Sequence, residues 1–508
     1  MPKNTYRELI LYSKPDVDLI KSNIAHINAK INTARLTTFN PKYTDRQKIF
    51  SLILEYILEN ERKIYGGYAL NKLLIDKSKQ HKQHNKHNNY YIYEDDELPD
   101  IDFYSYDPNT DIINLCNKIY DIGFTKVNGR EAKHKNTYSI YVNYELFCDI
   151  TYVPKYIYDN IAFKTIGETK IKYVDPHFMM IDYLKILTDP LGSGWRIEKT
   201  YTRLEQLCSV FPLYDIKESI TINSVDIQEK LDECIELIYD FIKNKNDIIV
   251  IGFYAYNYFL IKSNYEKLNL IDIPYIEIIS KNCKEDYTNI YNKIKEKYPD
   301  LNITYKEYYP FFMYNGYRIE IYIENELILI IYDYDNKCIP YQTLNFIDYK
   351  KNIEYSNINV NLGTFNLTLL YAQVNIIKNK IFKDRNMKLI YEKFVAHLIK
   401  MRNHYFGNTK KLLDDVYFSD LNLNCIYPDF NPEHENLIRY EKRKENNKPS
   451  MYIYDPNKNR KTEKDKNFYF PNISGNEIKN TKHSKLLNNN SDNSDDDITD
   501  DNVDNIDD

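Results

Sequence analysis

A short motif occurs twice in this chain, roughly 180 residues apart, and it limits the folds that the chain can adopt. The first copy is KIYGGYALNKLL (63–74), and the second is VIGFYAYNYFL (250–260). The copies share four residues at one spacing, which are Gly66, Tyr68, Ala69 and Asn71 in the first and Gly252, Tyr254, Ala255 and Asn257 in the second. Where the first copy has a second glycine, Gly67, the later copy has Phe253. A segment has therefore been duplicated, and one copy has lost a glycine.

Further patterns follow each copy in the same order. LPDIDFYS (98–105) returns as IPYIEIIS (273–280), and LFCDITYV (146–153) is matched with GYRIEIYI (316–323). These stretches alternate as strands do, and a helical repeat precedes each motif. The repeat is too long for a solenoid unit, so we predict two tandem domains of one α/β (α+β) fold.

The boundaries follow from helical periodicity and from changes in composition. The helix before the first motif is predicted from the spacing of Ile49, Leu52, Ile53, Tyr56 and Ile57. A later helical stretch opens with Asp175 as its cap and Pro176 at its first position. We predict an N-terminal extension (1–43), a first domain (44–215), a second domain (216–430) and a tail (431–508).

The tail is basic and then acidic, with nine Asp and no Lys or Arg from residue 487 to 508, and we expect it to be disordered. The net charge of −6 therefore hides a mildly basic body. Seven scattered cysteines without a CxxC pair favour a reducing compartment and argue against structural zinc. No run approaches the ~20 apolar residues of a membrane span, and the first residues lack a signal-peptide core. We expect a soluble intracellular protein.

Three aspartates form the pattern that carries chemistry. Asp100 and Asp102 stand two apart on a predicted strand, so their carboxylates share one face. Two negative charges at such a short distance repel each other unless a cation lies between them. Asp149 on a neighbouring strand could complete a cage of three carboxylates around that cation. Such oxygen ligands suit Mg²⁺ or Mn²⁺, which hold phosphates. Gly66 and Gly67, at a strand-to-helix turn, would let backbone amides approach a triphosphate.

Each part alone has a plainer explanation. An Asp-x-Asp on a strand is more often a solvated face than a metal site, and an unrelated α/β domain is the alternative for the whole. The conjunction resembles the signature of the polymerase β-like nucleotidyltransferase superfamily: Gly-Gly, then apolar-Asp-apolar-Asp-apolar, then apolar-Asp-apolar. An active copy followed by a degenerate one, with a basic end, is similar to the poly(A) polymerase catalytic subunits of poxviruses and of large cytoplasmic DNA viruses of the mimivirus kind.

The resemblance implies roles for these residues and a reaction. Asp100 and Asp102 would bind both metal ions, and Asp149 the ion that activates the 3′-hydroxyl of an RNA. ATP would be the substrate, and AMP would be added to mRNA 3′ ends without a template. Many family members have Gly-Ser at the turn, so the Gly66-Gly67 pair of this chain lacks a serine contact to the triphosphate.

The second copy has lost these ligands. Tyr275 replaces Asp100, Glu277 replaces Asp102, and Glu320 is matched with Asp149. Phe253 at the turn would obstruct a phosphate. We therefore expect residues 216–430 to form a degenerate, structural or RNA-holding domain.

A basic row and several wider alternatives stay open. Arg196, Lys199 and Arg203 share one helix face, which either holds the triphosphate or RNA or is simply solvated. The alternative functions are transfer of a nucleotide to a protein or small molecule, and a non-catalytic RNA-binding scaffold. The resemblance also implies the host cytoplasm (the viral factory) and the virion as locations, and a homodimer or a cap-methyltransferase-type processivity subunit as partners.

Overall fold

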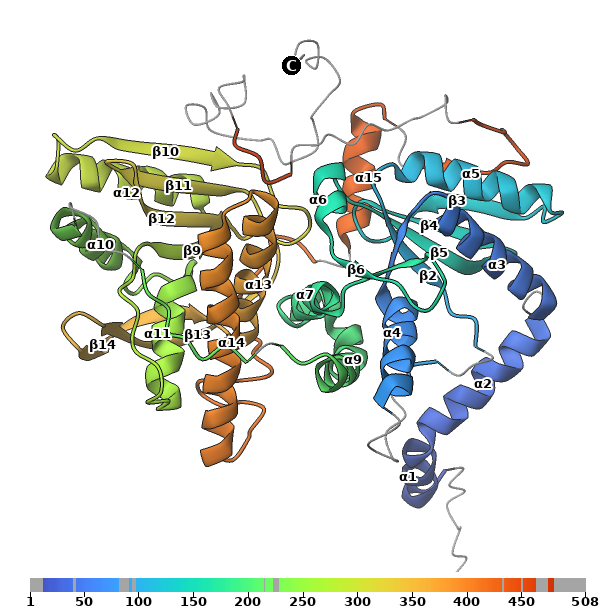
Figure 1. Cartoon of the computed structure of the whole chain (residues 1–508), viewed down its shortest axis with the longest axis horizontal. Coiled ribbons are helices and arrows are strands. Elements are labelled where there is room, and N and C mark those ends of the chain that lie inside the picture. The colour runs from blue at the N-terminus through green and yellow to red at the C-terminus, as the bar shows by residue number, and fades with distance from the viewer. Residues whose placement is uncertain are drawn as a thin grey trace, which may run out of the picture. The chain divides into compact units, whose positions relative to one another are not determined.

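The computed structural model describes residues 12–39, 43–81, 91–93, 97–213, 215–222, 228–431, 434–448, 451–462 and 474–478. The chain divides into two compact units, and each is built on one eight-stranded sheet (Figure 1). The first unit comprises residues 1–152, 163–174 and 440–469, and the second comprises 153–162, 175–439 and 470–508. Neither unit is a continuous piece of chain, so each is described by itself.

The first unit contains one mixed sheet and several helices, some of which pack against the sheet. Its helices are α1 (Lys14–Ser22), α2 (Ile24–Phe39), α3 (Tyr43–Glu59), α4 (Gly66–His81) and α5 (Pro108–Asp121). Its strands are β1 (Lys63–Tyr65), β2 (Ile101–Ser105), β3 (Val127–Glu131), β4 (Thr137–Val142), β5 (Glu145–Tyr152), β6 (Phe163–Lys164), β7 (Lys172–Val174) and β16 (Ile453–Tyr454). The strand order is β16-β3-β4-β5-β2-β1-β7-β6.

Burial explains why α3 packs where it does. The spacing predicted its inner face, and Ile49, Ile53, Tyr56 and Ile57 are indeed buried, whereas Leu52 is half-buried. Inside this core, Asp111 on α5 accepts hydrogen bonds from the Tyr56 hydroxyl and from the guanidinium of Arg62. A buried carboxylate needs such partners, because its charge has left water.

A late segment of the chain, residues 440–469, returns to the first unit. Part of the tail expected to be disordered is instead ordered, as α15 (Glu435–Glu445) and β16. β16 pairs antiparallel with β3 and covers the edge of the sheet, and the Tyr454 hydroxyl donates to Asn117 (2.6 Å). Arg443 makes a two-pronged ion pair with Glu131. The acidic segment 479–508 lies outside the described residues.

The second unit repeats the plan and adds helices. Its helices are α6 (Lys155–Asn160), α7 (Pro176–Leu187), α8 (Pro190–Ser193), the 3-10 turn η1 (Gly194–Arg196), α9 (Ile197–Val210), α10 (Gln228–Ile242), α11 (Gly252–Ser263), α12 (Cys283–Lys297), α13 (Phe365–Ile381) and α14 (Arg385–Asn408). Its strands are β8 (Ile248–Ile251), β9 (Ile276–Ser280), β10 (Ile303–Tyr308), β11 (Arg318–Ile323), β12 (Glu326–Asp333), β13 (Ile339–Asp348), β14 (Ile353–Gly363) and β15 (Cys425–Ile426).

The central strands of the two sheets match in order and direction. The second sheet runs β10-β11-β12-β9-β8-β14-β13-β15. Its β9 lies between a parallel β12 and an antiparallel β8, as β2 lies between a parallel β5 and an antiparallel β1. The predicted tandem repeat of one α/β fold is confirmed, with β8, β9 and β12 as the counterparts of β1, β2 and β5.

Two features depart from the plan expected from the sequence. Helices α7 to α9, placed before the boundary at residue 215, belong to the second unit, where α7 packs against α13. The cap of α7 is as predicted, with the Asp175 carboxylate accepting from the His177 amide (2.9 Å). Cys338 and Cys425 form a disulfide between the start of β13 and β15, although the cysteine pattern indicated a reducing compartment. No helix among the described residues is long and apolar enough to cross a membrane.

Candidate active site

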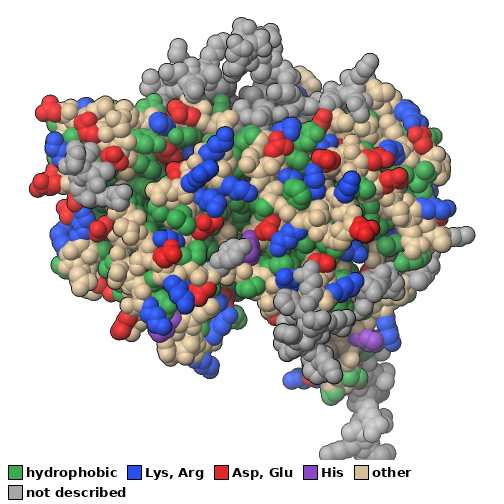
Figure 2. All heavy atoms as spheres, viewed as in Figure 1, with side chains coloured by type: hydrophobic (Ala, Val, Ile, Leu, Met, Phe, Trp, Pro, Cys, Tyr) green, Lys and Arg blue, Asp and Glu red, His purple; other side chains and the backbone are tan. Residues whose placement is uncertain are grey.

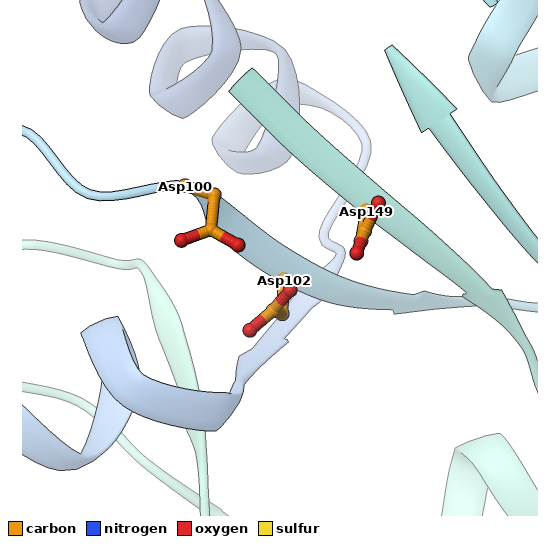
Figure 3. Close-up of side chains that lie close together, drawn as sticks. All are labelled: Asp100, Asp102 and Asp149. Atoms are coloured by element: carbon orange, nitrogen blue, oxygen red, sulfur yellow. The ribbon is translucent and has the colours of Figure 1, made fainter. Parts of the chain in front are cut away.

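Three carboxylates converge where two parallel strands of the first unit begin their pairing. Asp100 immediately precedes β2, Asp102 lies on β2, and Asp149 on β5 stands directly opposite Asp102 in the register. One oxygen of each lies within 4.8 Å of the others, and all three side chains point into a common space (Figure 3). The alternation of a strand sends Asp100 and Asp102 to one face, as expected from their spacing. All three predicted ligands are therefore brought together.

A serine that the sequence analysis did not single out orients one of these carboxylates. Ser139 lies opposite Asp149 on β4, and its hydroxyl donates to Asp149 Oδ1 (2.5 Å). The Ser139 side chain is buried and Asp149 is half-buried, so this bond is partly shielded from water. Next to it, burial raises the pKa of the Cys148 thiol, and the negative charges of Asp149 and Asp102 raise it further. The site thus has a field of negative charge that favours a bound cation.

The glycine turn abuts the same carboxylates. Gly66 begins α4 with φ +72°, and a Cβ on it would lie 2.2 Å from Asp102 Oδ2. Just before it, the Tyr65 ring stacks on Tyr104 with centroids 4.0 Å apart, and its hydroxyl hydrogen-bonds to Thr151 (2.8 Å). Gly67, on the first turn of α4, is buried. The predicted turn and the predicted carboxylates therefore meet, and the N-terminus of α4 opens beside them.

The asparagine of the repeated motif has a role that its spacing alone did not reveal. Asn71 Oδ1 accepts from the backbone amides of Ile92 and Tyr93, in the segment that leads to Asp100. In the second unit, Asn257 accepts from the amide of Ile271 and donates to its carbonyl, in the segment that leads to β9. The motif therefore contains an anchor for the chain before the carboxylate strand, and its recurrence in both copies was the available signal.

The basic row lies in the second unit. Arg196 ends η1, and Lys199 and Arg203 lie on α9. The Arg196 guanidinium lies 4.4 Å from the centroid of the exposed Trp195 ring, and the Lys199 side chain is exposed. Tyr201 on the same helix donates to the carbonyl of Asp420 (2.6 Å), which fixes α9. Contact between this row and a triphosphate stays a prediction.

The register of the second sheet corrects one assignment made from the sequence. Glu277 pairs with Ile330 on β12 just as Asp102 pairs with Asp149 on β5. Glu320 pairs with Ile330, as Ser139 pairs with Asp149. The match of Glu320 to Asp149 was therefore wrong, because β11 is the counterpart of β4. An isoleucine occupies the place of the third carboxylate in the second copy.

Aromatic and charged side chains fill the rest of that copy. Glu277 is buried and accepts from the hydroxyls of Tyr391 (3.0 Å) and Tyr332 (3.3 Å). Burial raises the pKa of Glu277, while burial and the charge of Arg318 lower the pKa of Lys378 to about 8. Phe253, in the place of Gly67, packs edge-on to Tyr275 with centroids 5.4 Å apart. The loss of metal-binding character predicted for this copy is thus accompanied by a closed interior.

Comparison with known proteins agrees with this geometry. The family model "Poly(A) polymerase catalytic subunit" matches residues 51–193, and "APMV, Putative poly(A) polymerase, catalytic subunit, C-terminal" matches residues 206–487. A "Putative poly(A) polymerase catalytic subunit" of Acanthamoeba polyphaga mimivirus is 29% identical over 471 residues, which are 88% of this chain and 78% of the relative. A protein of the same description from African swine fever virus (isolate Warthog/Namibia/Wart80/1980) is 25% identical over 32% of this chain and 30% of its own length.

A solved structure extends the likeness to nearly the full length. The crystal structure of the Megavirus polyadenylate synthase matches with a TM-score of 0.79 and 27% identity, over 94% of each chain. The second family model alone spans more than half of this chain. The chain therefore belongs to the family of viral poly(A) polymerase catalytic subunits, whose activity is polynucleotide adenylyl transfer.

Proposed function

We propose that Asp100, Asp102 and Asp149 form the site at which this poly(A) polymerase transfers AMP from ATP to the 3′ end of an RNA. The observation that supports this most directly is the convergence of three carboxylate oxygens within 4.8 Å, against the turn at Gly66. Carboxylates this close repel one another unless cations bind between them.

The donor set fits divalent magnesium or manganese. All three groups are hard oxygen ligands that keep contact with solvent, and Ser139 holds one of them in a fixed orientation. When bound, a pair of such ions stabilises the entering and leaving oxygens of an in-line displacement at phosphorus. In that reaction the RNA 3′-oxygen forms a bond to the α-phosphorus of ATP as the bond to pyrophosphate breaks.

Different residues of the site would position the metal ions, the triphosphate and the RNA end. Asp102 faces both Asp149 and Gly66, so it would hold an ion next to the turn. Asp149, held by Ser139, would bind the ion nearest the RNA hydroxyl. The amides at the start of α4 would receive the triphosphate, since Gly66 and Gly67 place no side chain over them. Asn71 anchors the chain that delivers Asp100.

We also propose that Arg196, Lys199 and Arg203 contact the triphosphate of ATP. The hydrogen bond from Tyr201 to the Asp420 carbonyl anchors α9, which supports a binding role for its basic residues. Replacing all three by Ala should raise the KM for ATP and leave RNA affinity unchanged. If the row contacts the RNA backbone instead, RNA binding weakens and its log–log salt slope falls by about 0.7 per lost contact. An unchanged KM and an unchanged slope would identify a solvated helix face.

The test of the main proposal uses a labelled single-stranded RNA, Mg²⁺ or Mn²⁺, and each nucleoside triphosphate separately. We expect RNA extension with ATP, read as a ladder on a denaturing gel. Asp102→Asn should abolish extension, because it removes a ligand charge, and should not lower the thermal midpoint in metal-free buffer, because it relieves repulsion. Asp121→Asn, at an exposed acid of the same unit, is the matched control.

Activity of Asp102→Asn within tenfold of wild type would exclude this site. Label from ATP found on protein or small molecules, with none on RNA, would favour the alternative acceptor, which the comparisons do not support. An inactive wild type that still binds RNA would point to the non-catalytic scaffold. The viral factory and virion as locations, and a homodimer or processivity subunit as partner, stay predictions.

A further inference from the structure

The turn between α13 and α14 in the second unit carries basic side chains beside an exposed aromatic ring. Lys380, Lys383 and Arg385 are exposed, and so is Phe382, with 44% of its surface accessible. Figure 2 shows Lys and Arg side chains gathered over this end of the helix pair. Neither Lys383 nor Arg385 has an ion-pair partner among the residues that the structure describes, whereas Lys380 donates to the carbonyl of Asn160 (3.1 Å).

The backbone of this turn places a lysine where glycine is the usual residue. The Asp384 amide donates to the Asn379 carbonyl and the Lys383 amide to the Lys380 carbonyl, which is the Schellman ending of a helix. Lys383 therefore lies in the left-handed region, with φ +62°. A side chain in that conformation costs about 1–2 kcal/mol relative to the ordinary helical region. The chain thus keeps a cation at a position where its own stability favours glycine.

Asp384, the acidic residue of the turn, forms no ion pair with Lys383 or Arg385. Asp384 caps α14, and its Oδ1 accepts from the amide of Met387 (2.9 Å). Lys388 on the next turn is paired with Glu392. The charge available to a ligand therefore comes from Lys383 and Arg385, which flank Asp384 in the sequence and directly follow the exposed Phe382.

We propose that this turn binds single-stranded RNA upstream of the 3′ end, with Lys383 and Arg385 on phosphates and Phe382 stacked on a base. Cations beside an exposed aromatic ring are the combination that sequence-tolerant single-strand binding uses. Arginine and lysine supply charge to the phosphates, and a base can stack on phenylalanine whatever its identity. The inference rests on the proposed function, since RNA is there the acceptor. It gives the degenerate unit a specific role in holding that RNA.

The test measures RNA binding without catalysis. A fluorescein-labelled 20-residue single-stranded RNA is titrated by anisotropy in EDTA without ATP, at several salt concentrations, with the Asp102→Asn protein. We expect Lys383→Gly and Arg385→Ala each to weaken binding several-fold and to lower the log–log salt slope by about 0.7. Lys383→Gly should also keep or raise the thermal midpoint, because it removes the backbone strain. Phe382→Ala should weaken binding about fivefold or more with an unchanged slope, and Phe382→Tyr should restore it.

Lys267→Ala, at another exposed lysine of the same unit, is the control and should change nothing. Folded Lys383→Gly and Arg385→Ala proteins that bind RNA with wild-type affinity and slope would overturn the proposal, and would leave the face to a partner other than RNA. Failure of the proposed function looks different. In that case the wild type adds no nucleotide, while RNA binding still depends on Lys383 and Arg385.

Discussion

Gly66 approaches Asp102 so closely that a Cβ on the glycine would lie 2.2 Å from the Asp102 carboxylate oxygen Oδ2. The second unit repeats the contact, with 2.4 Å between a Cβ on Gly252 and Glu277 Oε1. The repeated glycine is thus explained by contact with an acidic strand residue in both copies, whereas the second glycine, Gly67, belongs only to the copy with three carboxylates.

Gly66→Ala should therefore damage catalysis more than it damages folding. The methyl group would displace the Asp102 carboxylate, and the φ of +72° adds about 1–2 kcal/mol of strain. We expect RNA extension to fall by a hundredfold or more in a protein that still folds. Gly123→Ala is the control, because Gly123 has φ +102° in the same unit but nothing within 4 Å of its Cβ position. Equal activity of the two variants would mean that the contact with Asp102 is unimportant.

Ser139→Ala should weaken the response to metal. Without the hydroxyl, Asp149 loses a hydrogen bond to a charged group, of a kind that contributes about 1.5–3 kcal/mol. We expect the Mg²⁺ concentration for half-maximal extension to rise by roughly tenfold, and Ser139→Thr to recover part of it. Thr137→Val lies on the same strand but removes a bond to Thr151, so it should alter stability and not the metal response. A metal titration that Ser139→Ala leaves unchanged would contradict the positioning role.

Glu277→Gln should show the opposite pattern to Asp102→Asn. Glu277 is buried and accepts hydrogen bonds from two tyrosine hydroxyls. In the glutamine variant the side-chain NH₂ group would face one of these hydroxyl donors and the hydrogen bond would be lost. We expect a loss of about 1–3 kcal/mol in the free energy of unfolding, with single-nucleotide addition per folded molecule near wild type. The measurement pairs thermal melting with a single-turnover assay. Loss of addition comparable to that of Asp102→Asn would mean that the second copy takes part in catalysis.

His397 should make stability fall as the pH falls from 6.5 to 4. Its imidazole is buried, and the Tyr256 hydroxyl lies 2.9 Å from Nδ1. Burial, with the nearby charge of Lys400, lowers the pKa of His397 to about 4. Between pH 6.5 and 4 the unfolded chain binds a proton that the folded chain does not. The contribution is therefore complete above about pH 6.5 and loses about 2–3 kcal/mol by pH 4. His397→Gln should flatten that part of the pH–stability curve, and an unchanged curve would contradict the assignment.

Deleting residues 434–508 should destabilise the first unit, although they come last in the chain. The deletion removes β16 from the edge of β3, together with the Tyr454–Asn117 and Arg443–Glu131 contacts. We expect a lower melting temperature and faster proteolysis within residues 43–152. Deletion of 470–508, which keeps β16 and removes residues that contact the second unit, should leave proteolysis within residues 43–152 unchanged. Equal stability of the two truncated proteins would show that β16 contributes nothing.

The local parts of the site could be predicted from the sequence because their signals are local. Asp100 and Asp102 stand two apart in an apolar strand, and Asp149 is framed by apolar residues, so period-two alternation was enough to place them. Gly66 was found by its rarity and its repetition. Ser139 gave no such signal, because a serine on a strand is ordinary until the strand opposite it is known.

The errors came from pairings between distant segments. Both β11 and β12 have apolar sequences, and only β11 has an acidic residue at its centre, so Glu320 was matched with Asp149. In the structure β9 pairs in parallel with β12, and Ile330 on β12 occupies the position that corresponds to Asp149. The helices α7 to α9 follow the first sheet in sequence, but their apolar faces pack in the second unit. A two-residue strand such as β16 is too short to show any periodicity.

The pairing of β16 with β3 also determines when the first sheet can be completed during translation. The edge strand β3 ends at Glu131, but its partner ends at Tyr454, so more than 300 further residues must be translated before the sheet is complete. At about 5–20 residues per second, that delay is on the order of 15–65 s. The first unit would thus begin to emerge from the ribosome first, but its sheet would keep an open edge until residue 454 has been made, and a chaperone could protect that edge in the interval.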